Sequence, residues 1–139
     1  MQRECLPVQI SDLLLELGFA RDRFMLYVDR SEHEEITKFL TKKAVRKKFR
    51  IIIRQIATGL YNPDLYDKEE VSGKAKDITA MKFKGKKNYR VYCKEFHDGK
   101  RRIVMIQLLW KKTQKNNKQL RSRLEYLGGY HYEFPSETK

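Results

Sequence analysis

The sequence is short of the residues and motifs on which metal, disulfide and cofactor chemistry depend. Cys5 and Cys93 are its only cysteines, and two thiols so far apart indicate neither a disulfide framework nor a zinc cluster. His33, His97 and His131 lie in separate segments, without a paired spacing such as HxxxH. A Walker-type phosphate loop and a GxSxG nucleophile elbow are also missing. We therefore expect that any reaction proceeds without a metal ion, a small-molecule cofactor or a pair of carboxylates.

Long apolar segments are absent too. The N-terminal residues MQRECLPVQ lack the apolar core of a signal peptide, and no run approaches the length that spans a membrane. Apolar residues make up 40% of the 139 residues, which suffices for one compact domain, and they recur periodically along the chain. The sequence thus predicts a folded cytoplasmic protein.

Positive charge is abundant and concentrated in one segment. The chain carries 31 Lys and Arg against 18 Asp and Glu, a net charge of +13. From Lys82 to Arg123 there are 15 basic residues and two acidic ones, so this segment carries the whole excess. Such a concentration predicts attraction to a polyanion, with nucleic acid ahead of an anionic membrane. A soluble basic protein without such a partner is the alternative.

Hydrophobic spacing predicts an α+β fold. A strand is expected over 24–28, and a helical pattern then runs to about residue 60 with a bend near 41–44, which makes a helical hairpin. Ser31 followed by Glu34 is the pattern of a capping box at its start. A polar segment over 64–76 is expected to be a loop.

Three strands are expected next, over 78–83, 89–96 and 103–110, with turns between them. A last helix follows, capped by Asn116 or Asn117 and ended by Gly128-Gly129, with Leu120, Leu124 and Leu127 as its inward stripe. The predicted architecture is a small antiparallel-type sheet with the helical hairpin on one face, the other face partly open, and a C-terminal helix. A short N-terminal helix capped by Ser11 or Asp12 is added to it. The expected divisions are an N-terminal helical extension (1–23), the main domain (24–134) and a disordered tail (135–139).

Several cations on the predicted strands can form one patch. Lys82 and Lys84 alternate with Phe83 and so point to the same side, while Arg90 and Tyr92 share a side of the next strand. Such a patch suits a phosphodiester, because Arg forks across two oxygens and Lys supplies a point charge. Further basic residues follow the third strand, namely Lys111, Lys112 and Lys115. The aromatic residues that could stack on bases are Tyr89, Tyr92, Trp110, Tyr126 and Tyr130.

Core packing is the competing interpretation of these aromatics, and for Trp110 we prefer it. The basic face of the predicted helix over 42–54 also has several interpretations: a solvated surface, an extension of a polyanion-binding surface, or a surface that faces an acidic protein partner.

In their order and spacing, these motifs resemble the RelE/HigB branch of the RelE/ParE toxin superfamily. The residues that carry the resemblance are Met81-Lys82-Phe83-Lys84, Tyr89-Arg90-Val91-Tyr92, the apolar strand Ile103–Leu109, Trp110-Lys111-Lys112-Thr113-Gln114-Lys115 and the helix from Asn117. The resemblance covers about residues 24–130. It implies a microbial-ribonuclease-like fold and the toxin of a type II toxin–antitoxin system, a ribosome-dependent and metal-independent mRNA endoribonuclease that inhibits translation.

The resemblance also implies roles for particular residues. The catalytic positions would be Lys82, Lys84, Arg90, Lys112 and Lys115, and the RNA-binding ones Lys86, Lys87, Tyr92, Lys111, Arg121, Tyr126 and Tyr130. Its implied partners are the ribosome with its mRNA and an acidic antitoxin protein encoded nearby, with no membrane and no cofactor. Two alternatives stay open, namely a ParE-like gyrase inhibitor and an RNA-binding module without catalytic activity.

Overall fold

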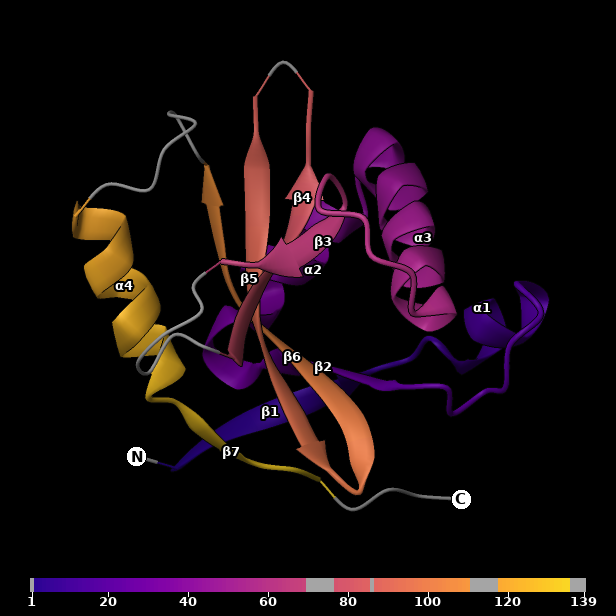
Figure 1. The fold of residues 1–139 in the computed structure, drawn as a ribbon, viewed down its shortest axis with the longest axis horizontal. Coiled ribbons are helices and arrows are strands. Elements are labelled where there is room, and N and C mark those ends of the chain that lie inside the picture. The colour runs from indigo at the N-terminus through magenta and orange to yellow at the C-terminus, as the bar shows by residue number, and fades with distance from the viewer. Residues whose placement is uncertain (1, 70–76, 86, 111–117, 136–139) are drawn as a thin grey trace.

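The computed structural model describes residues 2–69, 77–85, 87–110 and 118–135, and these residues form one seven-stranded sheet (Figure 1). In chain order its strands are β1 (Gln2–Val8), β2 (Met25–Asp29), β3 (Tyr66–Lys68), β4 (Ile78–Phe83), β5 (Tyr89–Asp98), β6 (Lys100–Trp110) and β7 (His131–Glu133). Across the sheet they lie in the order β3-β4-β5-β6-β2-β1-β7. The β2–β6 and β1–β7 pairs are parallel and the other pairs are antiparallel, so the α+β class is confirmed with a larger and more mixed sheet than expected.

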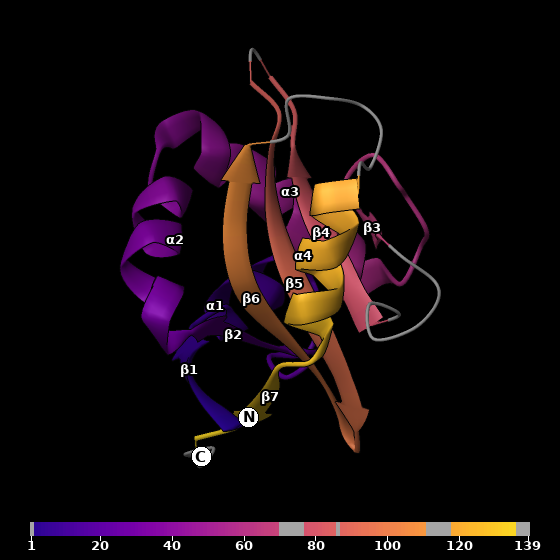
Figure 2. The same cartoon turned by 90° about the vertical axis from the view of Figure 1, so that its left-hand side faces the viewer.

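Helices cover both faces of this sheet. They are α1 (Ser11–Glu16), α2 (His33–Leu40), α3 (Lys43–Thr58) and α4 (Lys118–Gly128), with a 3-10 turn over Arg30–Glu32. Figure 2 shows α2 and α4 on opposite sides of β6. The expectation of a partly open face is therefore wrong over β4–β6, because α4 packs there.

A hydrophobic core on each face of the sheet explains why helices lie on both faces. Alternate strand residues such as Val28 and Met105 face α2 and α3, where they pack with Ile36 and Ile53. The opposite side chains of the same strands form the second core, with members Ile78, Tyr92, Ile106, Leu124 and Leu127. Because successive strand residues point to opposite faces, a sheet whose strands are apolar on both sides requires a cover on each. The predicted inward stripe of α4 is confirmed by the burial of Leu124 and Leu127.

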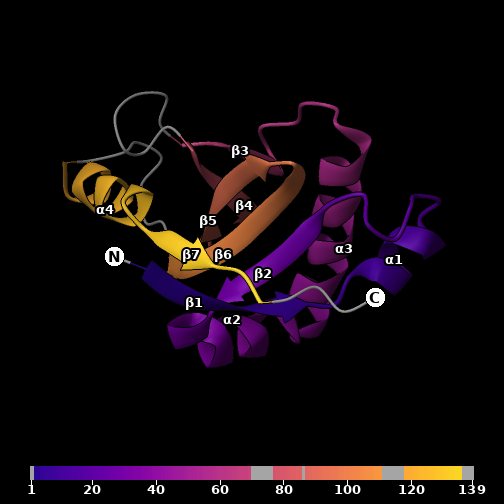
Figure 3. The ribbon, with the colours of Figure 1, turned by 90° about the horizontal axis from the view of Figure 1, so that it is seen from below.

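The N-terminal residues belong to the sheet, which the sequence did not predict. β1 pairs antiparallel with β2 and parallel with β7, and Figure 3 shows β1 and β7 side by side. The helix after it, α1, was predicted, but its cap was not: Ile10 stands at the N-cap, and the Ser11 hydroxyl donates to Gln9 Oε1. Residues 2–16 therefore contribute a strand and a helix to the main fold, with Leu14 fully buried.

The helical hairpin has the predicted bend but different ends. α2 ends at Leu40 and α3 begins at Lys43, which confirms the break near 41–44. The capping box is wrong, because Ser31 donates its amide and hydroxyl to Asp29 and α2 starts only at His33. α3 ends at Thr58, where Gly59 adopts φ +75°, a conformation that glycine tolerates best.

The strands β4, β5 and β6 lie where they were expected. β5 and β6 extend further than predicted toward the turn that joins them. The predicted loop over 64–76 is corrected in its described part, because Tyr66–Lys68 pairs with β4 as the edge strand β3. Residues 70–76 of that loop and residues 136–139 of the predicted tail lie outside the described residues. Among the described helices, none is long and apolar enough to cross a membrane.

Candidate functional site

The predicted strand cations lie together at one end of the sheet. Lys82 on β4 is directly opposite Arg90 on β5 in the antiparallel ladder, and Lys84 follows the end of β4. We call Lys82, Lys84 and Arg90 the cation cluster. Like charges directly opposite each other on a sheet are destabilising, so this arrangement requires compensating oxygen atoms.

The segment 62–69, which we call the acidic strap, supplies those oxygen atoms. Lys82 Nζ donates to the Pro63 carbonyl at 2.6 Å, and Lys84 Nζ donates to Asp64 Oδ1 at 2.9 Å. Arg90 Nη1 is paired with Glu69 Oε1. The hydrogen bond and the charge of Lys84 lower the pKa of the Asp64 carboxyl.

The two ion pairs of the strap differ in exposure. The Lys84 and Asp64 side chains are 54% and 77% exposed, whereas Arg90 and Glu69 are 15% and 7% exposed. Water and salt screen the first pair strongly and the second much less. A lysine ammonium has three donors and a guanidinium five, so each cation has more donors than the one strap oxygen that it contacts among the described residues.

The aromatic residues near the cluster divide into exposed and buried ones. Tyr92 is 1% exposed, and its burial raises the pKa of its hydroxyl to about 12. Its ring belongs to the core, which corrects its assignment as a base-stacking residue. Trp110, which we assigned to the core, is 46% exposed, with Lys87 Nζ 5.0 Å from its ring centroid.

The other predicted site residues are spread more widely. Arg121 and Tyr126 are exposed on α4. Tyr130 lies away from the cluster, stacked under the Arg3 guanidinium at 4.1 Å. The remaining predicted residues, Lys86, Lys111, Lys112 and Lys115, lie outside the part of the chain that the structure describes.

One lysine of the basic segment has a structural role. Lys94 is 6% exposed and donates to the carbonyls of Gly128 at 2.9 Å and Tyr130 at 2.7 Å. Burial lowers the pKa of its ammonium group. A cation that binds carbonyls at a helix C-terminus satisfies otherwise unpaired acceptors, so Lys94 fixes the end of α4.

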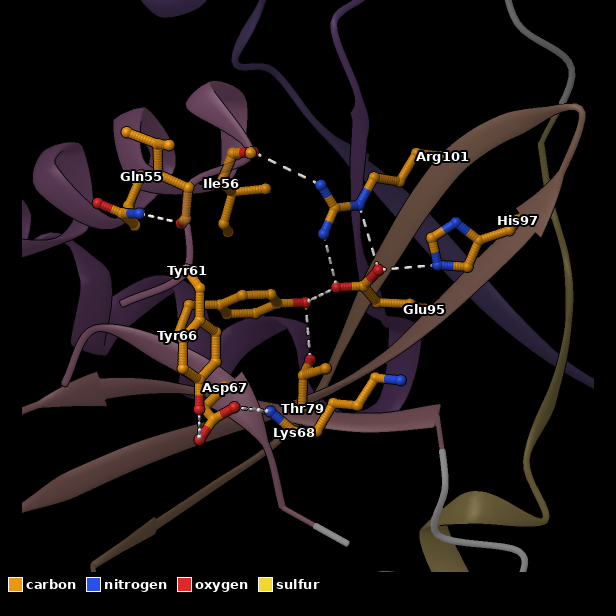
Figure 4. Close-up of a pocket in the computed structure, with 12 residues that line it drawn as sticks. Gln55, Ile56, Tyr61, Tyr66, Asp67, Lys68, Thr79, Glu95, His97 and Arg101 are labelled. Atoms are coloured by element: carbon orange, nitrogen blue, oxygen red, sulfur yellow. Dashed lines mark hydrogen bonds and ion pairs between the residues drawn. The ribbon is translucent and has the colours of Figure 1, made fainter. Parts of the chain in front are cut away.

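A second polar site, the Glu95 network, lies on the α3 face of the sheet (Figure 4). Glu95 Oε1 lies 2.9 Å from His97 Nε2 and 3.1 Å from Arg101 Nε. Its Oε2 accepts from Arg101 Nη2 at 3.0 Å and from the Tyr66 hydroxyl. The Tyr66 hydroxyl in turn accepts from Thr79 at 2.7 Å.

This network borders a pocket of about 420 Å³, but its carboxylate is saturated. A carboxylate has about four acceptor positions, and His97, Tyr66 and the two Arg101 nitrogens fill them. Burial raises the pKa of Glu95, but the bonds from Arg101 and Tyr66 outweigh it and lower the pKa below its ordinary value. Burial also raises the pKa of Tyr66 well above its usual range. We interpret the network as a clamp that joins β3, β5 and β6 to the end of α3.

The sequence analysis assigned no role to Glu95 and therefore missed this clamp. The usable signal was Glu95 and His97 two residues apart on one strand face, with Arg101 two residues beyond the turn Asp98-Gly99. A tight hairpin places 97 opposite 101, so the three side chains share one face.

A second buried carboxylate was also missed. Asp29 is 1% exposed and accepts from Arg3 Nε at 2.8 Å, from the Ser31 hydroxyl at 2.6 Å and from the Tyr132 hydroxyl at 2.5 Å. Burial raises the pKa of Asp29, and these hydrogen bonds lower it further than burial raises it. Asp29 thereby links β1, β2 and β7.

Within the described ranges, no group of three or more His, Cys, Asp or Glu side chains is placed to hold a metal ion. Cys5 and Cys93 are buried and free. Comparison of the chain with family models, with curated proteins and with solved structures gives no match.

Proposed function

We propose that the protein is a metal-independent endoribonuclease whose RNA-binding and transition-state-stabilising surface includes the cation cluster. The observation that carries this proposal is the convergence of Lys82, Lys84 and Arg90, each already bonded to an oxygen acceptor of the acidic strap. Three cations that hold a row of oxygen atoms offer the chemistry that a phosphodiester backbone requires. The exposed indole of Trp110 beside Lys87 adds a surface on which a base can stack.

The proposed reaction is transfer within the RNA itself. The 2′-oxygen of a ribose forms a bond to the adjacent phosphorus, and the bond from phosphorus to the 5′-oxygen breaks. The 2′-hydroxyl proton passes to solvent and the departing 5′-oxygen takes a proton from solvent, which leaves a 2′,3′-cyclic phosphate and a 5′-hydroxyl. Lys84 and Arg90 stabilise the negative charge that grows on the phosphoryl oxygens, a contribution that increases from ground state to transition state.

The biological setting of the proposal follows the resemblance to RelE/HigB toxins. The protein would act in the cytoplasm as the toxin of a type II toxin–antitoxin system, and its substrate would be mRNA on the ribosome. The concentration of positive charge between Lys82 and Arg123 supports an RNA partner and an acidic antitoxin that covers the same surface.

The test is cleavage of a defined mRNA by the purified full chain in the presence of translating ribosomes and a metal chelator that spares ribosomal magnesium. We expect new 5′ ends within translated codons, and a fall of about 10²–10³ in rate for Lys84→Ala and for Arg90→Gln. Lys47→Ala removes an exposed lysine from α3 and serves as the matched control. Cleavage that survives both cluster substitutions in folded protein would overturn the assignment.

A non-catalytic RNA-binding module is the second candidate. The observation in its favour is that the two described carboxylates nearest the cluster, Asp64 and Glu69, are both engaged in ion pairs. No described imidazole contacts the cluster, so a general base is not evident there. Binding of RNA without new 5′ ends would favour this candidate, whereas DNA damage signalling without mRNA cleavage would favour a gyrase inhibitor.

A further inference from the structure

The acidic strap holds the cation cluster in a way that resembles a bound nucleic-acid backbone. One oxygen atom each from Pro63, Asp64 and Glu69 accepts a hydrogen bond from one cation of the cluster. Two of these three acceptors are carboxylates, which match a phosphate in charge sign and in their ability to accept from Lys and Arg.

The strap is anchored beside the cluster independently of these ion pairs. The Lys82 amide donates to the Leu65 carbonyl at 2.9 Å, and β3 continues the ladder along β4. The strap backbone is therefore fixed, while the Asp64 and Glu69 side chains reach the cations through rotatable bonds. The exposed Asp64 carboxylate can leave its cation by a change of side-chain rotamer, whereas the Glu69 carboxylate must leave a largely buried position.

We propose that Asp64 and Glu69 occupy phosphate positions of the RNA site, so that the strap is a built-in competitor that RNA must displace. This inference rests on the proposed function and adds regulation of the same site. Like-charge repulsion between Lys82 and Arg90 is relieved by the strap in the free protein and by phosphates in the complex.

The two carboxylates compete unequally. The Lys84–Asp64 pair is exposed, so solvent already weakens it and RNA displaces it at little cost. The Arg90–Glu69 pair is nearly closed to solvent, and it controls the arginine that can fork across two phosphate oxygens. Glu69 is therefore the main competitor.

The experiment measures the affinity of the full chain for a fluorescent single-stranded RNA that is 2′-O-methylated at every ribose. This probe cannot be cleaved, because the attacking hydroxyl is blocked, so binding is separated from catalysis. The dissociation constant is measured between 50 and 200 mM salt for wild type, Asp64→Asn and Glu69→Gln, with thermal unfolding of each variant as the folding check.

We expect Glu69→Gln to bind about tenfold more tightly at low salt, since Arg90 gains a phosphate in place of its internal partner. The slope of log affinity against log salt should steepen by about 0.7 for that one additional phosphate contact. For Asp64→Asn the expected gain is at most about fivefold, the equivalent of a surface ion pair.

The matched control is Glu16→Gln. It changes the net charge by the same amount as the strap variants. It releases Arg50 on α3 from an exposed ion pair of 2.9 Å, and neither residue belongs to the strap or the cluster. A gain confined to the strap variants supports the proposal, and an equal gain in Glu16→Gln overturns it, because net charge would then suffice.

The outcomes also separate this inference from the proposed function. Weaker binding by Arg90→Gln together with no gain in either strap variant overturns the strap as a competitor and leaves RNA binding intact. Failure of every variant to bind RNA overturns the proposed function itself. If Glu69→Gln is unfolded, the Asp64→Asn variant decides. RNA binding tighter than that of Glu16→Gln supports the proposal, and equal affinities of the two variants overturn it.

Discussion

The cation cluster and the Glu95 network are both charged sites that include residues of β4 and β5. The cluster is built from hydrogen-bond donors, whereas the network is built around one acceptor, the Glu95 carboxylate. In the network one carboxylate is filled by four donor nitrogen and oxygen atoms and has no acceptor position left. In the cluster, cations with several donors each are held by a strap that offers one acceptor atom to each. A ligand rich in oxygen atoms finds partly exposed cations in the cluster, whereas the Glu95 carboxylate of the network has no acceptor position for a further donor.

This difference separates a site that stabilises the fold from one that can bind. The network joins β3, β5, β6 and α3 through the Glu95 carboxylate, which is 10% exposed, so loss of Glu95 leaves Arg101 and the Tyr66 hydroxyl without their shared acceptor. In the cluster the Lys84–Asp64 pair is exposed, so its loss leaves little unpaired, whereas the Arg90–Glu69 pair is largely buried. Stability and RNA chemistry should therefore respond to substitutions at different residues.

The largest effect on stability is expected from Glu95→Ala. The substitution leaves Arg101 and the Tyr66 hydroxyl without their common acceptor, and removal of one partner of a buried ion pair costs about 3–5 kcal/mol. Urea unfolding followed by circular dichroism measures it. Glu125→Ala, on the exposed side of α4, is the control and should change stability by less than about 0.5 kcal/mol. Equal effects of the two substitutions would refute the clamp.

The pH dependence of stability should reveal the two buried carboxylates. The folded-state pKa values of Glu95 and Asp29 lie below their ordinary values of 4.5 and 3.8, so both stabilise the fold above those values. Their contribution is lost as the pH falls through the lower folded-state values, by about 1.4 kcal/mol for each unit of difference. Unfolding free energies measured from pH 6 to pH 2 test this, and Asp29→Asn should flatten the curve. A wild-type curve with no decline would contradict both assignments.

A smaller effect is expected from Tyr132→Phe. The substitution removes the 2.5 Å hydrogen bond to Asp29 but keeps the ring and the salt bridge from Arg3. Hydrogen bonds to charged groups contribute about 1.5–3 kcal/mol, and we expect a loss near the lower end because Arg3 and Ser31 continue to donate. Tyr126→Phe, at an exposed ring, is the matched control. Thermal unfolding that gives the same midpoint for both variants would show that Asp29 does not depend on this donor.

The smallest effect on stability is expected at Lys84, the member of the cation cluster with an exposed ion pair. Lys84→Ala removes an exposed ion pair and should change the free energy of unfolding by less than about 1 kcal/mol. The same variant is expected to lose RNA cleavage, so measuring both quantities on one protein tests the comparison directly. A loss of stability as large as that of Glu95→Ala would show that the cluster is structural.

Local sequence patterns predicted the regular elements well where periodicity was strong. The strands over 78–83 and 89–96, the break between α2 and α3, and the Leu124 and Leu127 stripe all follow from alternation or helical spacing. Short polar segments failed: β1 and β3 have weak alternation, and pairing with β2 and β4 is what makes them strands. The capping box failed because Asp29, two residues before Ser31, was the better acceptor.

By itself the sequence determined the α+β class, the main strands and the position of the excess charge, because these depend on residue spacing and composition. It also predicted that cations of neighbouring strands could form one patch, and the structure places Lys82 opposite Arg90. Only the tertiary structure decided what each charge contacts. The strap reaches the cluster from about 20 residues away, and Tyr132 reaches Asp29 across 103 residues, separations that no local pattern encodes. Three cations of one basic segment differ in their partners. Lys94 caps a helix, Arg101 belongs to the clamp, and Arg90 is a candidate for RNA binding.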